Sequence, residues 1–160
     1  MQFSAADIAN YAAAAGFTGD DLPTAVAIAL AESNGDPNAY NPESQAGAPA
    51  GKGSYGLWQI YLNAHPQFAG WNLYDPRANA AAAFTVYTAA GNSFAPWTTF
   101  KSGAYTAYLS TAQDGVIADA QGLPQGPSSP ALASALDFTN PIVIAIALVF
   151  GVLVLKDFFD

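Results

Sequence analysis

The chain has 160 residues, of which 52% are hydrophobic and only 10% are charged, and its net charge is −8 at pH 7. With only 4 Lys and Arg residues it has no basic patch to neutralise phosphates, which argues against nucleic-acid binding. It has no Cys and 1 His, so disulfides, thiolate metal sites and a multi-His metal centre are excluded. The low charge content points to a membrane segment or to a neutral, polar ligand surface.

The first expected helix covers residues 4–15. Ser4 is a suitable N-cap, Asp7 stands at the third helical position, and Gly16 ends the helix. The early acidic residue and the lack of a basic n-region argue against a secretory signal peptide here.

A second helix is expected to end at about Ser33, with Pro23 in its first turn, where the missing N–H costs nothing. The apolar residues 25–31 precede one acid, Glu32. A carboxylic acid at the end of such a helix can be partly desolvated, and desolvation keeps it protonated near neutral pH. A general acid needs that proton, although a solvated Glu at a helix C-terminus is the simpler alternative.

Beyond this helix the pattern is less regular. Residues 34–55 predict a long loop, and ordered loops of this length are usually functional. Residues 56–64 predict a short helix or a strand-like segment. Asp75, followed by Pro, begins the clearest capped helix, which is expected to reach about residue 91. Residues 103–111 and the turn after them, to about residue 120, are expected to be helical.

After residue 121 the chain becomes rich in Pro, Gly and Ser and then strongly apolar, unlike the part before it. This change predicts a domain at residues 1–121, a Pro/Gly/Ser linker at 122–137 and a transmembrane anchor at 138–160. The unbroken apolar run at residues 142–155 would span only about 21 Å as a helix, but extension over residues 138–159 gives a length that crosses a bilayer. Aromatic residues at both ends suit the interfaces. The alternative is a long buried helix that packs on the domain.

Three segments carry a family resemblance: AIALAESNGDPNAYNP at residues 27–42, SYGLWQI at 54–60, and DPRANAAAA at 75–83 with PWTTFKSGAYTAYL after it. Together they resemble the lytic transglycosylase and goose-type lysozyme superfamily, in particular the compact lysozyme-like domains of phage virion proteins. The resemblance covers about residues 22–109. It implies a mainly α fold: a lysozyme-like (goose-type/SLT) helical domain, here followed by the linker and one C-terminal hydrophobic helix.

The resemblance implies that Glu32 is the general acid/base. It would protonate the glycosidic oxygen between N-acetylmuramic acid and N-acetylglucosamine. A lytic transglycosylase then deprotonates the C6 hydroxyl of the muramoyl sugar to give a 1,6-anhydro product, whereas a hydrolase activates water. A two-carboxylate glycosidase needs a second acid nearby, for which Glu43 is the best candidate because Asp36 and Asp75 have turn and cap explanations. A single-acid mechanism is preferred.

The same resemblance implies a sugar groove around this acid. The expected substrate-binding residues are Ser33, Ser54, Tyr55, Gly56, Gln59, Asn79, Trp97 and Tyr105. Gly56 would let the backbone approach the sugar, and Gln59 would present an amide or brace the catalytic helix. Trp97 would stack on a sugar face, with core packing as the alternative for Trp97 and Tyr55.

One segment departs from the family pattern. The family often has a Tyr three residues before the Gly of its Y-N-x-G motif, with the hydroxyl near the catalytic Glu. Here Phe100 stands three residues before Gly103, so the hydroxyl is missing at that position, and Tyr105 or Tyr108 could substitute. His65 is expected to be structural or exposed, and no metal or organic cofactor is expected.

The expected function is therefore a peptidoglycan lytic transglycosylase that cleaves the β-1,4 bond of the glycan strand. The expected setting is a phage virion protein that aids wall penetration during genome entry, with glycan strands, a lipid bilayer through residues 138–159 and other virion proteins as partners. Lys156 places the C-terminal tail on the cytoplasmic side and the catalytic domain towards the wall or periplasm. The alternatives are a hydrolytic muramidase, a weak or inactive structural virion protein, and a holin-like membrane protein.

Overall fold

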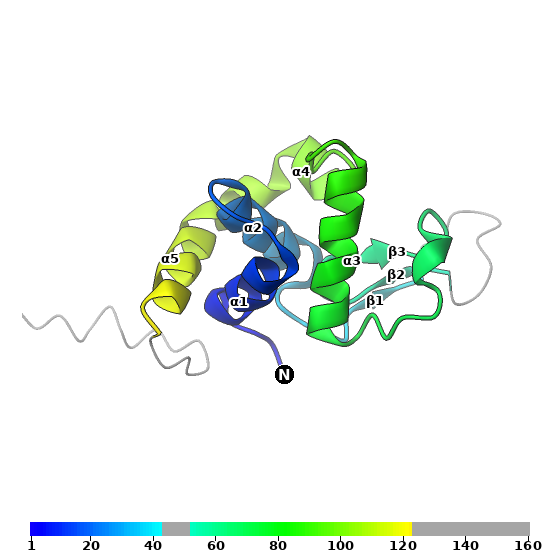
Figure 1. Cartoon of the computed structure of the whole chain (residues 1–160), viewed down its shortest axis with the longest axis horizontal. Helices are drawn as coiled ribbons and strands as arrows, with labels where there is room; N and C mark the ends of the chain where they lie inside the picture. Colours follow the sequence, from blue (N-terminus) through cyan, green and yellow to red (C-terminus); the bar gives the residue numbers. More distant parts are fainter. Residues whose placement is uncertain (43–51, 123–160) are drawn as a thin grey trace, which may run out of the picture. The chain divides into compact units, whose positions relative to one another are not determined.

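The computed structural model describes residues 1–42 and 52–122, and these residues belong to one compact unit (Figure 1). Its elements in chain order are α1 (Ala5–Ala15), α2 (Asp21–Ser33), β1 (Tyr40–Asn41), β2 (Ser54–Tyr55), β3 (Ile60–Tyr61), the 3-10 helix η1 (Pro66–Phe68), α3 (Pro76–Ala89), α4 (Thr98–Ser102), the 3-10 helix η2 (Ala104–Tyr108) and α5 (Leu109–Ala120). This part of the chain is mainly helical, as expected. Residues 123–160, with nearly all of the predicted linker and the whole predicted anchor, lie outside the described part.

None of the helices within residues 1–42 and 52–122 combines the length and the apolar character that crossing a membrane requires. The predicted anchor is not among the residues to which this finding applies.

Helix α1 begins and ends as its sequence predicts. The Ser4 Oγ accepts the Asp7 N–H at 3.2 Å, and the Asp7 carboxylate accepts the Ser4 N–H at 2.9 Å, which is a reciprocal capping box. Gly16 follows the helix at φ +121, and a Cβ there would lie 2.8 Å from the Phe84 ring. The glycine thus serves both the backbone turn and the packing of α1 beside α3.

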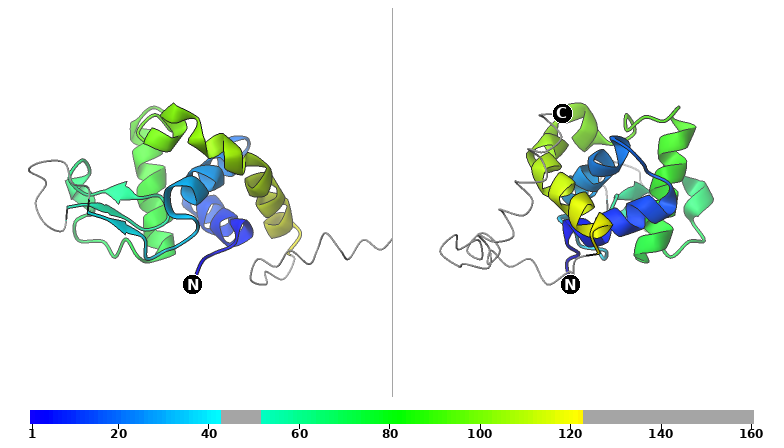
Figure 2. Two further views of the ribbon diagram at one scale, coloured as in Figure 1. Left: turned by 180° about the vertical axis from the view of Figure 1, so that it is seen from behind. Right: turned by 60° about the vertical axis from the view of Figure 1, so that its left-hand side comes forward.

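Helix α2 is the central helix of the unit. Its residues 25–30 are all buried, because α1, α5, η2 and α4 pack around it (Figure 2). Pro23 lies in the first turn, as expected. The side chain of Asp20, which precedes the helix, makes no capping bond, and the helix ends at Asn34 in the left-handed conformation with φ +52. The alternating small alanines let the neighbouring helices come close to its axis.

The segment that the sequence describes as one long loop contains two strands, β1 and β2. With β3 they form an antiparallel sheet in the order β1-β2-β3, on the α3 side of the unit and away from α5 (Figures 1 and 2). The expected short helix or strand at residues 56–64 is the tight turn between β2 and β3 together with β3 itself. Strands of two residues are too short to show a period-2 pattern, which is why the sequence does not reveal them.

Helix α3 has the predicted cap, since the Asp75 carboxylate accepts the N–H groups of Arg77 and Ala78 at 2.9 and 3.0 Å, with Pro76 at the first helical position. The helix expected after Gly103 is divided into η2 and α5, and a further short helix, α4, precedes it. Gly103 itself has φ +79 and separates α4 from η2.

Candidate active site

Glu32 lies at the penultimate position of α2, half-buried, at the edge of an open pocket of about 410 Å³. The end of α2, the sheet and the segment that leads into α4 all contribute to its walls. Its described lining residues are Glu32, Asn41, Ser54, Gln59, Tyr61, Pro96, Trp97, Thr98 and Thr99. Glu32 is the only charged side chain among them, so the pocket offers hydrogen bonds and one acid rather than a charged surface.

The register of the sheet decides which residues reach this pocket. Asn41 pairs with Ser54, and Ser54 pairs with Tyr61, so these three side chains share one face of the sheet. All three line the pocket. The structure therefore places the predicted residue Ser54 at the site, together with two residues that the sequence analysis did not select.

Tyr55 lies on the opposite face of the same strand. Its ring packs against Tyr40 and Tyr74, with centroid distances of 4.9 and 5.6 Å. Burial, and then the neighbouring Tyr40, raise the pKa of Tyr55 above its usual value. Tyr55 does not line the Glu32 pocket, because consecutive residues of a strand point to opposite faces.

A hydroxyl group does meet the acid, but from a residue that the sequence analysis missed. The Thr99 Oγ1 donates a hydrogen bond to the Glu32 Oε1 at 2.7 Å. Phe100, the next residue, packs its ring against Phe94 and Tyr105 at 5.7 and 5.1 Å. The hydroxyl that the family pattern places at position 100 thus comes from Thr99, one residue earlier. The two Thr residues in PWTTFKSG are the sequence feature that could have indicated this hydroxyl.

Trp58 connects the segment before α4 to the helix that carries Glu32. Its indole N–H donates to the Ala25 carbonyl in α2 at 2.9 Å, while its own carbonyl accepts the indole N–H of Trp97 at 2.9 Å. Both indoles are largely buried, with Trp58 0% and Trp97 6% exposed. Trp97 lines the pocket as predicted for a ligand-facing residue, but most of its ring packs in the core.

The structure corrects the interpretation of Asn79. This side chain is 0% exposed, so it cannot touch a ligand in the pocket. Its Oδ1 accepts the Trp58 N–H at 2.9 Å, and its Nδ2 donates to the carbonyls of Tyr55 and Leu73 at 2.8 and 2.9 Å. Asn79 therefore holds the turn between β2 and β3 against α3.

Gly56 belongs to the same buried junction. It has φ +70, and a Cβ at this position would collide with the Leu73 carbonyl and with the Asn79 amide. The close approach that requires a glycine is thus to Asn79 and Leu73, and the structure contains no exposed backbone surface at Gly56 for a sugar to approach.

Gln59 lines the pocket and also braces it. Its Nε2 donates to the carbonyls of Ala39 and Gly56 at 3.2 and 2.9 Å, and its backbone is left-handed, with φ +47. The amide therefore ties the chain just before β1 to the β2–β3 turn. Two functions are predicted for Gln59. Presenting an amide to the pocket agrees with its position, but the segments that it braces are the chain before β1 and the β2–β3 turn, not the helix that carries Glu32.

Two predicted binding residues, Ser33 and Tyr105, are not among the described residues that line the pocket. Ser33 follows Glu32, and its Oγ donates to the Ala29 carbonyl within α2 at 2.9 Å. Tyr105 lies in η2 and stacks on Phe100.

The other acids considered as partners of Glu32 have local functions. The Asp36 Oδ1 accepts the Asn38 N–H at 2.9 Å and stabilises the turn after α2, while Asp75 caps α3. Glu43, the predicted second carboxylate, lies outside the described residues. Within residues 1–42 and 52–122, no three His, Cys, Asp or Glu side chains gather in a way that could hold a metal ion.

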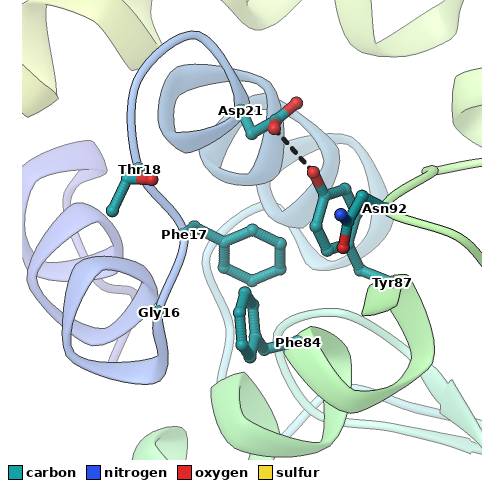
Figure 3. A pocket seen from close by; sticks show the side chains of 7 residues that line it. All are labelled: Gly16, Phe17, Thr18, Asp21, Phe84, Tyr87 and Asn92. Carbon is teal, nitrogen blue, oxygen red and sulfur yellow. Dashed lines mark hydrogen bonds between the residues drawn. The ribbon is translucent and has the colours of Figure 1, made fainter. Parts of the chain in front are cut away.

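A second pocket, of about 240 Å³, lies at the other end of α2 (Figure 3). There the Tyr87 hydroxyl donates to the Asp21 carboxylate at 2.6 Å. This hydrogen bond, and then burial, raise the pKa of Tyr87 to about 12. The pocket is lined by Gly16, Phe17, Thr18, Asp21, Phe84, Tyr87 and Asn92.

Comparison with known proteins agrees with this architecture. The model of a family described as "Lysozyme like domain" matches residues 9–99, which is more than half of the chain. The match includes Glu32, the sheet and Thr99, and it ends before Tyr105. No curated protein and no solved structure matches the chain.

Proposed function

The chain belongs to the family of lysozyme-like domains, and we propose on that premise that it is a peptidoglycan lytic transglycosylase. Its substrate would be the β-1,4 bond between N-acetylmuramic acid and N-acetylglucosamine. The observation that carries the proposal is the Glu32 carboxyl group, half-buried at the end of α2 and held by the Thr99 hydroxyl at the edge of an otherwise uncharged pocket.

The proposed first step uses Glu32 as a general acid. The carboxyl proton passes to the glycosidic oxygen, the bond from this oxygen to C1 of the muramoyl sugar breaks, and positive charge develops at C1. Thr99 fixes one carboxyl oxygen through its hydrogen bond, which restricts the orientation of the group that transfers the proton. The buried Trp58 and Trp97 link the segment before α4 to α2 through their indole hydrogen bonds.

In the second step Glu32 acts as a base. The carboxylate removes the proton from the C6 hydroxyl of the same sugar, and the C6 oxygen bonds to C1 to close a 1,6-anhydro ring. This internal nucleophile needs no second carboxylate, which agrees with the presence of a single acid among the described residues that line the pocket. A hydrolytic muramidase would instead deliver water to C1.

The products distinguish these two outcomes. Purified peptidoglycan is incubated with the full chain, and the released muropeptides are separated and weighed by mass spectrometry. We expect anhydro-muropeptides, each lighter by one water than the hydrolysed form, from the wild type and far less of them from Glu32→Gln. Reducing muramic acid ends would assign the protein as a hydrolase, and an inactive wild type would assign it a non-catalytic function.

The proposal extends to the setting in which the enzyme works. We propose a phage virion protein that opens the wall during genome entry, held in a membrane by residues 138–160, with the catalytic domain on the side of the wall or periplasm. The apolar run at residues 142–155 and the single cation after it support this part. Flotation of the full chain with phospholipid vesicles, beside a chain that ends at residue 122, tests it: only the full chain should float.

A further inference from the structure

One polar atom near the proposed active site is buried without satisfying its hydrogen-bonding capacity. The Tyr61 hydroxyl is inaccessible to solvent and has no hydrogen-bond partner among the described residues. A buried donor without a partner costs on the order of 1–3 kcal/mol of stability, so native proteins contain few of them. Because Tyr61 lines a binding pocket, a small rotation of its side chain would bring this hydroxyl within reach of a ligand, which then supplies the missing partner.

The position of Tyr61 connects this hydroxyl to the Glu32 pocket. Tyr61 shares the pocket-facing side of the sheet with Ser54 and Asn41. It also lines a smaller side pocket of about 50 Å³, whose described residues are Gln59, Ile60, Tyr61, His65, Val86, Pro96 and Trp97. Four of these residues line both pockets, so the side pocket adjoins the main one. Its volume exceeds the roughly 10–15 Å³ that one water needs.

The side pocket combines a hydrogen-bond donor with apolar walls and carries no charge near neutral pH. Ile60, Val86, Pro96 and Trp97 supply apolar surface. Burial lowers the pKa of His65, so its imidazole is neutral at pH 7. Among the described residues that line either pocket there is no Lys or Arg, so a carboxylate would find no cationic partner among them. A suitable occupant is therefore small and uncharged, with one acceptor oxygen and one apolar end.

We propose that this side pocket receives the N-acetyl group of a sugar bound beside Glu32, and that the Tyr61 hydroxyl donates a hydrogen bond to the acetamido carbonyl oxygen. The acetamido methyl then lies towards Pro96 and Trp97. This inference rests on the proposed function, because it assumes a glycan in the Glu32 pocket. It assigns to Tyr61 the recognition of the N-acetyl substituent, which distinguishes amino-sugar polymers from unsubstituted glucans.

The variant Tyr61→Phe tests the inference in two measurements on the full chain. Thermal unfolding should occur at the same or a higher temperature than in the wild type, because the variant removes a buried donor that has no partner. Affinity for N-acetylglucosamine tetramer, measured by calorimetry in a Glu32→Gln background to prevent turnover, should fall about tenfold, as expected for the loss of one hydrogen bond. Cellotetraose, which lacks acetamido groups, should bind equally to both proteins.

A matched control is Tyr74→Phe. Tyr74 is 39% exposed, packs against Tyr55 on the other face of the sheet and does not line either pocket. The same chemical change there should leave both sugar affinities as they are in the wild type.

Several outcomes would overturn the inference. Lower stability of Tyr61→Phe would mean that the hydroxyl is bonded in the free protein. An unchanged affinity for the N-acetylated tetramer, or no binding of it by the parent protein, would remove the proposed contact. Equal weakening for both tetramers would assign the bond to a ring hydroxyl instead. If the parent binds the N-acetylated tetramer through Tyr61 but the wild type cuts no peptidoglycan, only the proposed function fails.

Discussion

The two ends of helix α2 carry the same kind of interaction in two different surroundings. At the start, the Asp21 carboxylate accepts a hydrogen bond from the Tyr87 hydroxyl of α3 at 2.6 Å; near the end, the Glu32 carboxyl accepts one from Thr99 of α4 at 2.7 Å. The eleven-residue separation corresponds to about 17 Å along the helix. Each bond joins α2 to an element far away in the sequence.

The Asp21–Tyr87 and Glu32–Thr99 pairs differ in their surroundings. Asp21 is exposed at a helix N-terminus, where the helix dipole favours a negative charge, and Tyr87 packs with Phe17 and Phe84 (Figure 3). Glu32 is half-buried near a helix C-terminus, where the dipole disfavours a negative charge, and it faces a polar pocket. The same bond is therefore expected to stabilise the fold at one end and to orient a reacting group at the other.

The largest expected difference is in activity after removal of each acid. Glu32→Gln should lower peptidoglycan cleavage by about 10²–10⁴-fold, the usual range for loss of a general acid. Asp21→Asn makes the same chemical change at the other end of the helix and should leave cleavage within about twofold, since its amide oxygen still accepts the Tyr87 bond. Release of labelled muropeptides measures both, and equal losses would mean that the two ends do not differ in function.

The second comparison removes the hydroxyl partners. Thr99→Val should lower the rate of cleavage about tenfold with little change in stability, because the carboxyl group of Glu32 loses its orienting bond. Tyr87→Phe should instead cost about 1 kcal/mol of stability and leave the rate unchanged. Steady-state rates and urea unfolding of both variants provide the measurements. A Thr99→Val protein that is destabilised but fully active would make Thr99 structural.

A pH dependence of stability is expected at the Asp21 end of α2. The pKa of Tyr87 rises from 10.0 to about 12 in the folded protein, because the bond to Asp21 and burial both favour the neutral hydroxyl. The folded protein therefore holds this proton more tightly than the unfolded chain. The resulting stability is complete below pH 10 and is lost as the pH rises towards about 12. The difference in unfolding free energy between wild type and Tyr87→Phe should shrink across that interval, and a constant difference would contradict the assignment.

The smallest expected effect concerns Ser33, beside the proposed catalytic acid. Its hydroxyl bonds to the Ala29 carbonyl within the same helix, an arrangement that contributes little because the helix already satisfies that carbonyl. Ser33→Ala should change the unfolding free energy by less than about 0.5 kcal/mol. Cleavage should stay within about twofold, and a larger loss of activity would show that Ser33 meets the glycan strand, as the sequence analysis predicts.

The parts of the fold that the sequence predicts well are those controlled by neighbouring residues. Ser4 with Asp7, Gly16, and Asp75 with Pro76 mark helix ends through bonds that span a few residues. The placement of Glu32 at the end of an apolar helix follows from the same local pattern. The sheet is different, because each strand has only two residues, and its pairing depends on segments brought together by the rest of the fold.

Among the site residues, the errors follow from side-chain direction. Asn79 is on the predicted helix, but its side-chain amide is buried and makes hydrogen bonds to the backbone of Trp58, Tyr55 and Leu73 instead of facing the pocket. Tyr61 was missed because nothing in the segment QIYLN distinguishes a pocket-facing Tyr from a core Tyr. The face of the sheet on which the Tyr61 side chain lies depends on the strand register. The pairing of Ser54 with Tyr61 establishes that register, and it is not visible in the sequence.

By itself the sequence predicted helices α1, α2 and α3, the caps of α1 and α3 and the family resemblance, and it proposed Glu32 as the acid. Helix ends and apolar runs depend on residues close together in the chain, which is why these features could be read from it. Only the tertiary structure decided that Thr99 rather than Tyr105 meets Glu32, and that Ser54 rather than Tyr55 faces the pocket. Thr99 and Glu32 are 67 positions apart. A contact over that separation depends on how α4 packs on α2, and a shift of one residue would replace the Thr99 hydroxyl with a Phe100 ring.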